Sequence, residues 1–422
     1  MAPIRGLATI RVAPVGAHER GGWSAVVVAA SGTVRPDKLT RVVRVAWLVA
    51  MLGNVAYVMS RPFGWSLDLS VYRNGGAAWL EGLPIYIDHF AVSLGGPDLP
   101  FTYPPVAVVL FSPLAWVPLP VAIFVILALN LAALTVLCLV AASRVCGRGA
   151  AATRWGLGAA AAATVFDPVR ETLWFGQINL LLAVLVLLDC LLARTRLPRG
   201  TLIGLAAAIK LTPAVFVLFF LAGKQWRPAI TAFASFVFFA VLGFLIMPTD
   251  AKQFWFHALV DPGRVGRLTY ASNQSIRGVL ARFSLEGTAQ VAVWVLLSLL
   301  VVVLAMIAAA KARAAGCDVE AFLLVALAGL LISPVSWGHH WMWIAPALTL
   351  FALPVVRRYW WLSVPSALIF LVGPHWLFPR DNDVERNWEW WQQVIGNAYV
   401  WFGLAVVVGF AFTRWSHRPV SD

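Results

Sequence analysis

Charged residues are scarce in this sequence of 422 residues. Asp, Glu, Lys and Arg make up only 12% of the chain, whereas hydrophobic residues make up 61%. A chain so poor in charge is too apolar for a soluble domain, and it is typical of a protein that crosses a membrane several times. The 21 tryptophans fit the same class, because tryptophan collects at membrane–water interfaces.

Cysteine is scarcer still, and the usual nucleotide-binding and hydrolase signatures are missing. The sequence has no Walker loop, no glycine fingerprint for dinucleotides and no Ser-His-Asp signature. The four cysteines lie in or beside apolar stretches without metal-type spacing, so we predict free thiols. We expect no cofactor and assign no residue as a metal ligand. These cysteines are Cys138, Cys146, Cys190 and Cys317.

Acidic residues are also few, at 19 against 32 Lys and Arg, which gives a formal net charge of +13. So basic a chain is a candidate for nucleic-acid binding. The basic residues, however, occur in short clusters between apolar stretches, a pattern that marks cytoplasmic loops facing anionic lipid. We therefore predict membrane lipids, and no nucleic acid, as partners.

Several apolar stretches are long enough to be membrane spans, which need ~20 mostly apolar residues. Two further stretches are ambiguous: residues 104–118 are short and contain several prolines, and residues 200–222 are interrupted by Lys210 and Pro213. The expected spans lie near residues 41–60, 119–142, 155–166, 177–193, 228–247, 289–311, 319–333, 341–356, 358–374 and 396–413.

The positive-inside rule favours one topology. If residues 104–118 dip into the membrane without crossing it, and residues 200–222 form two short helices meeting at Lys210, every basic linker falls on the cytoplasmic side. This all-α polytopic model has about twelve membrane helices with both termini inside. In the alternative, where 104–118 crosses and 200–222 is one span, the basic loop at 144–154 moves outside.

The predicted topology divides the chain into three parts. Residues 1–40 are expected to form a disordered cytoplasmic tail, residues 41–413 a single transmembrane domain, and residues 414–422 a cytoplasmic C-terminal tail. The first outer loop covers residues 61–103 and, like the other outer loops, carries most of the informative polar residues. An active site in this chain is therefore expected to face outward.

Asp68 is the first acid placed just beyond the end of a membrane span. It is expected to reach water, and two interpretations are open. It caps the helix that runs from about Ser70 to Leu80, or it is a deprotonated general base at the membrane surface. Asp88 and Asp98, in the same loop, look like ordinary loop acids.

Lys210 is a cation inside an apolar stretch, where a charge is costly and usually faces a cavity or a partner. Its ammonium either snorkels to the membrane interface or holds an anion. Pro213 breaks the helix three residues later and frees backbone groups. A lysine beside such a break is well placed to bind a phosphate.

Side-chain amides open or precede two other spans. Gln177 and Asn179 either cap the span at 177–193 or hydrogen-bond to sugar hydroxyls, which amides do well. Asn273 and Gln274 lie before the span at 289, together with the guanidinium of Arg277. This second pattern is weak by itself.

His339 and His340 follow an outer helix end. Two adjacent histidines cannot both face one site on a regular helix. A metal site would need more ligands at suitable spacing, and no carboxylate cluster is near in sequence. One of the two histidines contacting a phosphate or an acceptor is the preferred interpretation.

An ordered set of motifs resembles the polytopic glycosyltransferases of the C superfamily, and within it family 87 of actinobacteria, which uses polyprenyl-phosphate sugars. The similarity extends over most of the membrane region and is strongest to members that add an α-1,2-linked mannose to phosphatidylinositol mannosides. The motifs are DLSVYRNGGAAWLEGLPIY at 68–86, FTYPPVAVVLFSPLAWVP at 101–118, FGQINLLL at 175–182, GLAAAIKLTP at 204–213, NQSIRGVLAR at 273–282 and SPVSWGHHW at 333–341.

The resemblance implies an enzyme of the plasma membrane with its active site on the outer face. Its donor would be polyprenyl-phosphate-mannose and its acceptor a glycolipid. Asp68 occupies the position of a catalytic Asp in the first outer loop. Many relatives outside the family carry a second acid there, but Leu69 and Ser70 follow Asp68 here, which argues against a metal held by two neighbouring acids and leaves metal dependence open.

The chemistry of the transfer then assigns roles to the other residues. Asp68 would take a proton from the acceptor hydroxyl, and attack opposite the leaving group would invert the anomeric centre. The departing lipid phosphate would be stabilised by Lys210 and by His339 or His340, and Arg277 is a further candidate. The residues expected to orient sugars or the acceptor are Tyr72, Arg73, Tyr103, Gln177, Asn179, Asn273, Gln274 and Trp337.

Other functions fit parts of the same pattern. A transferase that adds mannose or arabinofuranose to lipomannan or lipoarabinomannan is one alternative within the enzyme class. A flippase for lipid-linked sugars is another, because transporters also carry charges at broken helices, although near the bilayer midplane. A non-catalytic membrane scaffold is a third. The concentration of motifs in outer loops favours an enzyme.

Overall fold

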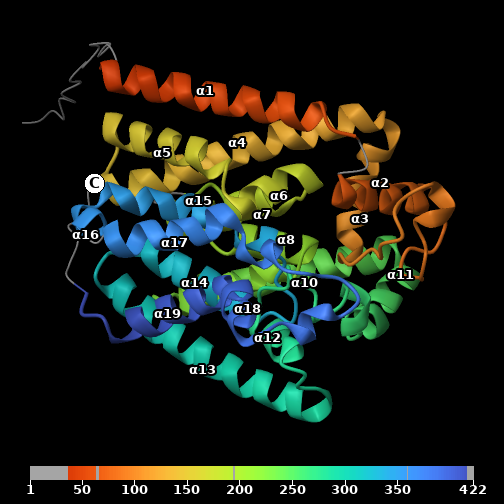
Figure 1. Cartoon of the computed structure of the whole chain (residues 1–422). Coiled ribbons are helices and arrows are strands. Elements are labelled where there is room, and N and C mark those ends of the chain that lie inside the picture. Colours follow the sequence, from red (N-terminus) through yellow and green to blue (C-terminus); the bar gives the residue numbers. More distant parts are fainter. Residues whose placement is uncertain (1–36, 63–65, 193–194, 359, 416–422) are drawn as a thin grey trace, which may run out of the picture. The chain divides into compact units, whose positions relative to one another are not determined.

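The computed structural model describes residues 37–62, 66–192, 195–358 and 360–415, and these residues form helices and connecting loops without β-strands (Figure 1). The all-α prediction is confirmed for this part of the chain. The first helix, α1, begins at Lys38. The two predicted tails fall almost entirely on residues 1–36 and 416–422, which lie outside the described residues.

Four helices are long and apolar enough to cross a membrane by length and composition: α1 (Lys38–Met59), α4 (Leu119–Cys146), α10 (Trp226–Ile246) and α13 (Gly287–Ala314). They correspond to the spans expected at 41–60, 119–142, 228–247 and 289–311. Two bent pairs raise the number to as many as six among the described residues. These pairs are α6 (Asp167–Phe175) with α7 (Asn179–Leu191), bent by 117°, and α18 (Trp390–Gly396) with α19 (Ala398–Phe412), bent by 66°.

The remaining helices are shorter and connect or cover these spans. They are α2 (Leu67–Leu80), α3 (Pro105–Phe111), α5 (Ala150–Ala163), α8 (Thr201–Ile209), α9 (Val217–Ala222), α11 (Pro248–Gln253), α12 (Ile276–Arg282), α14 (Asp318–Ile332), α15 (Ile344–Ala347), α16 (Pro354–Arg358) and α17 (Trp360–Val372). Single turns include η3 (Ser112–Trp116), η4 (Thr212–Phe216), η7 (Gly338–Trp341), η9 (Pro374–Leu377) and η10 (Val384–Asn387).

The stretch at 200–222 breaks at Lys210, as the sequence predicts. Helix α8 ends at Ile209, Lys210 is extended with φ −149° and ψ 127°, and η4 and α9 follow. The break has a local cause, because Pro213 lacks a backbone N–H and its ring obstructs a continuous helix. The stretch at 104–118 forms α3 and η3, which together are too short to cross a membrane alone.

Helix α8 is anchored at its start and along one side. The Asp189 carboxylate, on α7, accepts hydrogen bonds from the backbone N–H groups of Gly200 (2.8 Å) and Ile203 (2.9 Å). Helix α10 packs against α8 so closely that a Cβ at Gly204 would collide with the Ala232 carbonyl oxygen. These contacts fix the position of Lys210 at the far end of α8.

The largest hydrophobic core joins buried side chains of α2, α4, α7, α9 and α14. A second core joins α13, α14 and α19 around Trp341 of η7. Figure 1 shows α6, α7 and α8 in the middle of the helical body, between α4 and α5 on one side and α14 and α13 on the other. Asn179 and Lys210, described next, lie at the ends of two of these central helices.

Candidate active site

Lys210 lies at the centre of a cluster of polar side chains from distant parts of the sequence. Its Nζ donates hydrogen bonds to Asn179 Oδ1 (2.8 Å) and Tyr103 OH (3.2 Å), and it lies 3.5 Å from His340 Nε2. Asn179 opens α7, Tyr103 precedes α3, and His340 belongs to η7. The Lys210 ammonium therefore faces polar partners inside the protein.

Two buried tyrosines extend this cluster towards α2. The hydroxyls of Tyr72 and Tyr103 lie 2.7 Å apart, and Tyr72 donates to Gln177 Oε1 at 3.0 Å. Asn130, on α4, donates to the backbone carbonyl of Gln177 at 2.9 Å and so fixes the residue that precedes α7. Burial and the Asp68 carboxylate raise the pKa of Tyr103, which stays a neutral phenol.

Asp68 is in the first turn of α2 and is half-buried. Ser66 occupies the N-cap position, so the interpretation of Asp68 as the helix cap is wrong. Asp68 is also less open to water than its place in an outer loop suggests. Burial raises the pKa of Asp68 to about 6, although Lys210 and a hydrogen bond from Gln177 act in the opposite direction. At neutral pH the group is mostly ionised and is a stronger base than an exposed carboxylate.

His340 presents a hydrogen-bond donor beside the Lys210 ammonium. The backbone N–H of Trp337 donates to His340 Nδ1 at 3.1 Å, so the neutral ring carries its proton on Nε2. Burial and the charge of Lys210 lower the pKa of His340, which keeps the ring neutral. Two donors, Nε2–H and Nζ–H, thus meet at one point, an arrangement that suits an anion.

His339 has a different environment. Its ring is only 6% exposed and packs edge-on against Phe175 with 5.7 Å between ring centres. Its backbone carbonyl accepts a hydrogen bond from Thr172 Oγ1 at 3.2 Å. Of the two histidines, His340 is the one that lines the pocket beside Lys210.

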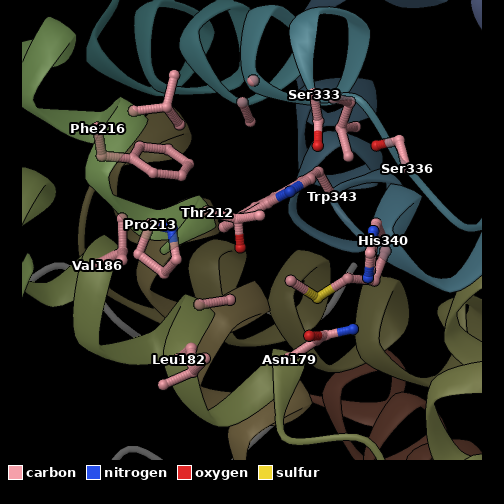
Figure 2. A pocket seen from close by; sticks show the side chains of 16 residues that line it. Asn179, Leu182, Val186, Thr212, Pro213, Phe216, Ser333, Ser336, His340 and Trp343 are labelled. Carbon is pink, nitrogen blue, oxygen red and sulfur yellow. The ribbon is translucent and has the colours of Figure 1, made fainter. Parts of the chain in front are cut away.

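This pocket is a small cavity of about 60 Å³ (Figure 2). Figure 2 shows Asn179 and His340 close together at one end and Leu182, Val186 and Phe216 at the other. The cavity thus has a polar end at the cation cluster and an apolar remainder between helices. Other side chains lining it are Thr212, Pro213, Val215, Leu330, Ser333, Ser336, Met342 and Trp343.

Two arginines predicted as site residues lie away from the Lys210 cluster. Arg73 donates to the backbone carbonyls of Leu114 and Val117 at the end of η3. Arg277 contacts Gln290 Oε1 at 3.4 Å, and its guanidinium lies 5.0 Å from the Trp294 ring centre. The structure does not bring either arginine to Lys210.

Asn273 and Gln274 are fully buried and brace the turn that carries His340. Asn273 Oδ1 accepts from the Ser336 N–H at 3.0 Å, and the Gln274 N–H donates to the Ser336 carbonyl at 2.7 Å. Gln274 Nε2 also donates to Gly396 at 2.8 Å. The Asn273 amide and the Gln274 Nε2 group are used within the protein, whereas Gln274 Oε1 has no partner among the described residues. Sugar contact by these residues stays a prediction. Trp337 is half-buried, and its ring lies 6.0 Å from that of Tyr270.

Sequence reasoning missed a second polar group, formed by Asp167, Glu171 and His375. The four-residue spacing of Asp167 and Glu171 in DPVRET would place both on one face of a helix, and this was the available signal. Nothing in the sequence connects this pair with His375.

Several apolar helices around a buried lysine, a carboxylate and a small pocket with one polar end fit the class of membrane enzymes. Comparison with known proteins makes this class specific. Residues 101–334 match the model of glycosyltransferase family 87. The chain belongs to this family, and it is a glycosyltransferase.

The most informative relatives are mycobacterial. A polyprenol-phosphate-mannose-dependent alpha-(1-2)-phosphatidylinositol mannoside mannosyltransferase of Mycobacterium tuberculosis is 39% identical over 393 residues, which cover 86% of this chain and 90% of the relative. The protein of the same description from Mycolicibacterium smegmatis is 37% identical over 409 residues, covering 90% and 92%. An alpha-(1->3)-arabinofuranosyltransferase of Corynebacterium glutamicum is 27% identical over 384 residues, covering 87% and 86%. No solved structure matches the chain.

Proposed function

We propose that this protein transfers mannose from polyprenol-phosphate-mannose to a phosphatidylinositol mannoside and forms an α-(1-2) linkage. The observation that carries the proposal is the similarity to the two mycobacterial mannosyltransferases over almost the whole chain. The convergence of Lys210, His340 and Asp68 agrees with it, because such a reaction needs an anion site close to a base.

The donor phosphate binds between Lys210 Nζ and His340 Nε2. These two donors lie 3.5 Å apart, and a phosphate oxygen placed between them accepts a hydrogen bond from each. The negative charge that develops on the leaving lipid phosphate is stabilised there. The prenyl chain follows the apolar side of the cavity, between α7 and η4.

Asp68 is the general base of the transfer. As the acceptor hydroxyl attacks the anomeric carbon, its proton moves to the Asp68 carboxylate, the new C–O bond forms, and the bond to the lipid phosphate breaks. Attack opposite the leaving group converts a β-mannosyl phosphate into an α-mannoside. Tyr103 and Asn179 accept hydrogen bonds from Lys210, and Tyr72 connects Tyr103 to Gln177, the neighbour of Asp68. These four residues orient the sugar through their hydroxyls and amides.

The enzyme works on the outer face of the plasma membrane, in a topology of about twelve membrane helices with both termini in the cytoplasm. The break at Lys210 supports this arrangement, because two half-helices at 200–222 leave every basic linker inside. The acceptor glycolipid approaches from the outer leaflet, next to the first outer loop and Asp68.

The test uses the purified chain in detergent with phosphatidylinositol mannoside acceptors of defined length. Polyprenyl-phosphate-mannose should give one added hexose, and NMR of the product should show an α-(1-2) linkage. A parallel reaction with a polyprenyl-phosphate arabinofuranose donor is the control suggested by the corynebacterial relative. Transfer from the arabinose donor alone would replace the proposal with an arabinofuranosyltransferase.

A further inference from the structure

A second polar cluster lies outside the arrangement of Lys210, His340 and Asp68. Asp167 begins α6, Glu171 follows one turn later, and His375 belongs to η9. Each side chain offers one ligand atom, and the three atoms lie within 4.8 Å of one another. The residues are 1%, 5% and 1% exposed, so the cluster is inside the protein.

Several polar atoms of the cluster have no hydrogen-bond partner among the described residues. They are Glu171 Oε2 and both ring nitrogens of His375. A buried polar atom without a partner costs ~1–3 kcal/mol, and such atoms in native proteins usually have an ion, a water or a function. The His375 ring also points at the cluster, because its Nε2 lies 3.9 Å from Asp167 Oδ2.

Two carboxylates of the cluster share one cationic neighbour, Arg170. Arg170 pairs with Asp167 Oδ1 at 2.8 Å, and Tyr399 donates to Asp167 Oδ2 at 3.1 Å. Trp376 is a hydrogen-bonding neighbour of both carboxylates, but it carries no charge. No salt bridge is found for Glu171 among the described residues, and its carboxylate lies within 4.8 Å of the Asp167 carboxylate. A divalent cation in this space would compensate the charge that Glu171 carries when it is ionised.

The backbone leaves space at the same point. A Cβ on Gly338 would lie 2.9 Å from Glu171 Oε2 and 3.1 Å from His375 Nε2. Any side chain at position 338 would therefore fill the space that the two unpartnered groups face. Glycine keeps this space open in η7, the turn that carries His340.

We propose that Asp167, Glu171 and His375 bind one divalent transition-metal ion of the zinc or manganese type. An imidazole nitrogen with two carboxylate oxygens suits such ions, whereas Mg²⁺ and Ca²⁺ prefer oxygen ligands alone. Metal–ligand bonds of ~2.0–2.2 Å place neighbouring ligand atoms ~3–4 Å apart, so the carboxylates need only a small movement to close on the ion.

The ion would position the turn that holds His340. Glu171 is followed by Thr172, whose Oγ1 donates to the His339 carbonyl at 3.2 Å, and Gly338 packs on the metal ligands. A metal here joins α6 and η9, against which η7 packs through Gly338, and it does not touch the phosphate. The three ligands are positioning residues and take no part in proton transfer.

Metal binding is tested on the purified full-length chain in detergent after treatment with a chelator. Co²⁺ serves as a spectroscopic probe, followed by visible absorption and titration calorimetry. One Co²⁺ per chain should bind, and the affinity should fall at least about tenfold in Glu171→Gln and in His375→Gln. His89→Gln is the matched control, because it removes a histidine that lies 2.7 Å from the Asp98 carboxylate on an exposed loop, and it should bind Co²⁺ like the wild type.

A second measurement needs no variant and no turnover. X-ray absorption at the zinc edge of the Zn²⁺-loaded wild-type chain should show nitrogen and oxygen ligands with the scattering of one imidazole. A folded wild-type chain that binds neither Co²⁺ nor Zn²⁺ would overturn the inference, as would equal Co²⁺ binding in wild type and both folded ligand variants. The mannosyl transfer proposed above is untouched by either result.

Discussion

A substitution at Asp68 tests whether this carboxylate is the general base of the transfer. It lies in the first turn of α2, where burial raises its pKa to about 6. Asp68→Asn keeps the size of the side chain and removes its basicity. Turnover should fall by roughly 10²–10⁴, the usual contribution of general base catalysis. Thermal stability and donor binding should be retained, and a variant with near-normal turnover would place the base elsewhere.

The pH profile reports on the same group. Only ionised Asp68 accepts a proton, and its pKa is above the usual aspartate value, so kcat/KM should decline as the pH falls through about 6. An ordinary exposed aspartate would give this decline near pH 4. The proposed donor, polyprenol-phosphate-mannose, is a phosphodiester and does not titrate in this range. The measurement is kcat/KM from pH 4.5 to 8.5, and a flat profile through pH 6 would contradict the assignment.

Substitutions at Lys210 distinguish a lysine with a structural role from one that binds the donor phosphate. Lys210→Met removes a buried charge, so the folded chain should be as stable as the wild type or more stable. It also removes a charge-assisted hydrogen bond of ~1.5–3 kcal/mol, so donor affinity should fall by about 10–100-fold. Lys210→Arg should restore only part of the affinity, because a planar guanidinium presents its donors differently.

Thermal unfolding and donor titration of both Lys210 variants make this comparison. Lys252→Met is the control, since Lys252 is exposed on α11 and away from the cluster. Its donor affinity should equal that of the wild type. A stable Lys210→Met chain with wild-type donor affinity would remove Lys210 from the site.

Lys210 is held in place because a contact from α7 fixes the start of α8, the helix that precedes it. Asp189 holds the start of α8 through two backbone N–H groups, and Lys210 follows the other end of this helix. Asp189→Ala should lower the free energy of unfolding by ~0.5–2 kcal/mol and also weaken donor binding. Asp189→Asn, which can still accept one of these hydrogen bonds, should lose less. Equal donor affinity in the wild type and in both Asp189 variants would show that the anchoring of α8 does not affect donor binding.

The sequence predicts a structural feature well when the residues that cause it lie close together in the chain. The break at Lys210 follows from Pro213, three residues away, and the sequence places it correctly. Which of His339 and His340 lies beside Lys210 depends on hydrogen bonds to other residues. The Trp337 N–H donates to the His340 ring, and Thr172 donates to the His339 carbonyl. Two adjacent histidines in a sequence reveal neither contact. Asn273 and Gln274 read as free amides in sequence, but they pair with Ser336 and Gly396 far along the chain.

The same limit applies to charge clusters. The i and i+4 spacing of Asp167 and Glu171 is visible in the sequence, but their approach to His375 depends on how η9 packs against α6. The opposite error occurs for Arg73 and Arg277, which look available in sequence and are held by η3 carbonyls and by Gln290. Tertiary contacts between distant segments decide these cases, and sequence motifs do not contain them.

At the scale of the whole molecule, topology decides which side of the membrane the site faces. Single cysteines introduced in a Cys146→Ser background, where the other native cysteines are buried, are labelled with an impermeant reagent in intact cells. Asp88→Cys should be labelled from outside, and Arg148→Cys and Lys224→Cys should not. External labelling at position 224 would make residues 200–222 a full span and would contradict the half-helix arrangement.

The central claim is that one site holds the donor phosphate between Lys210 and His340 with Asp68 close to the anomeric carbon. A cryo-EM structure of the Asp68→Asn chain with polyprenyl-phosphate-mannose tests it most directly, because slow turnover preserves the donor. The account predicts the phosphate within hydrogen-bond distance of Lys210 Nζ and His340 Nε2, with the mannose between this phosphate and residue 68. A phosphate bound away from both donors, or a mannose out of reach of residue 68, would contradict it.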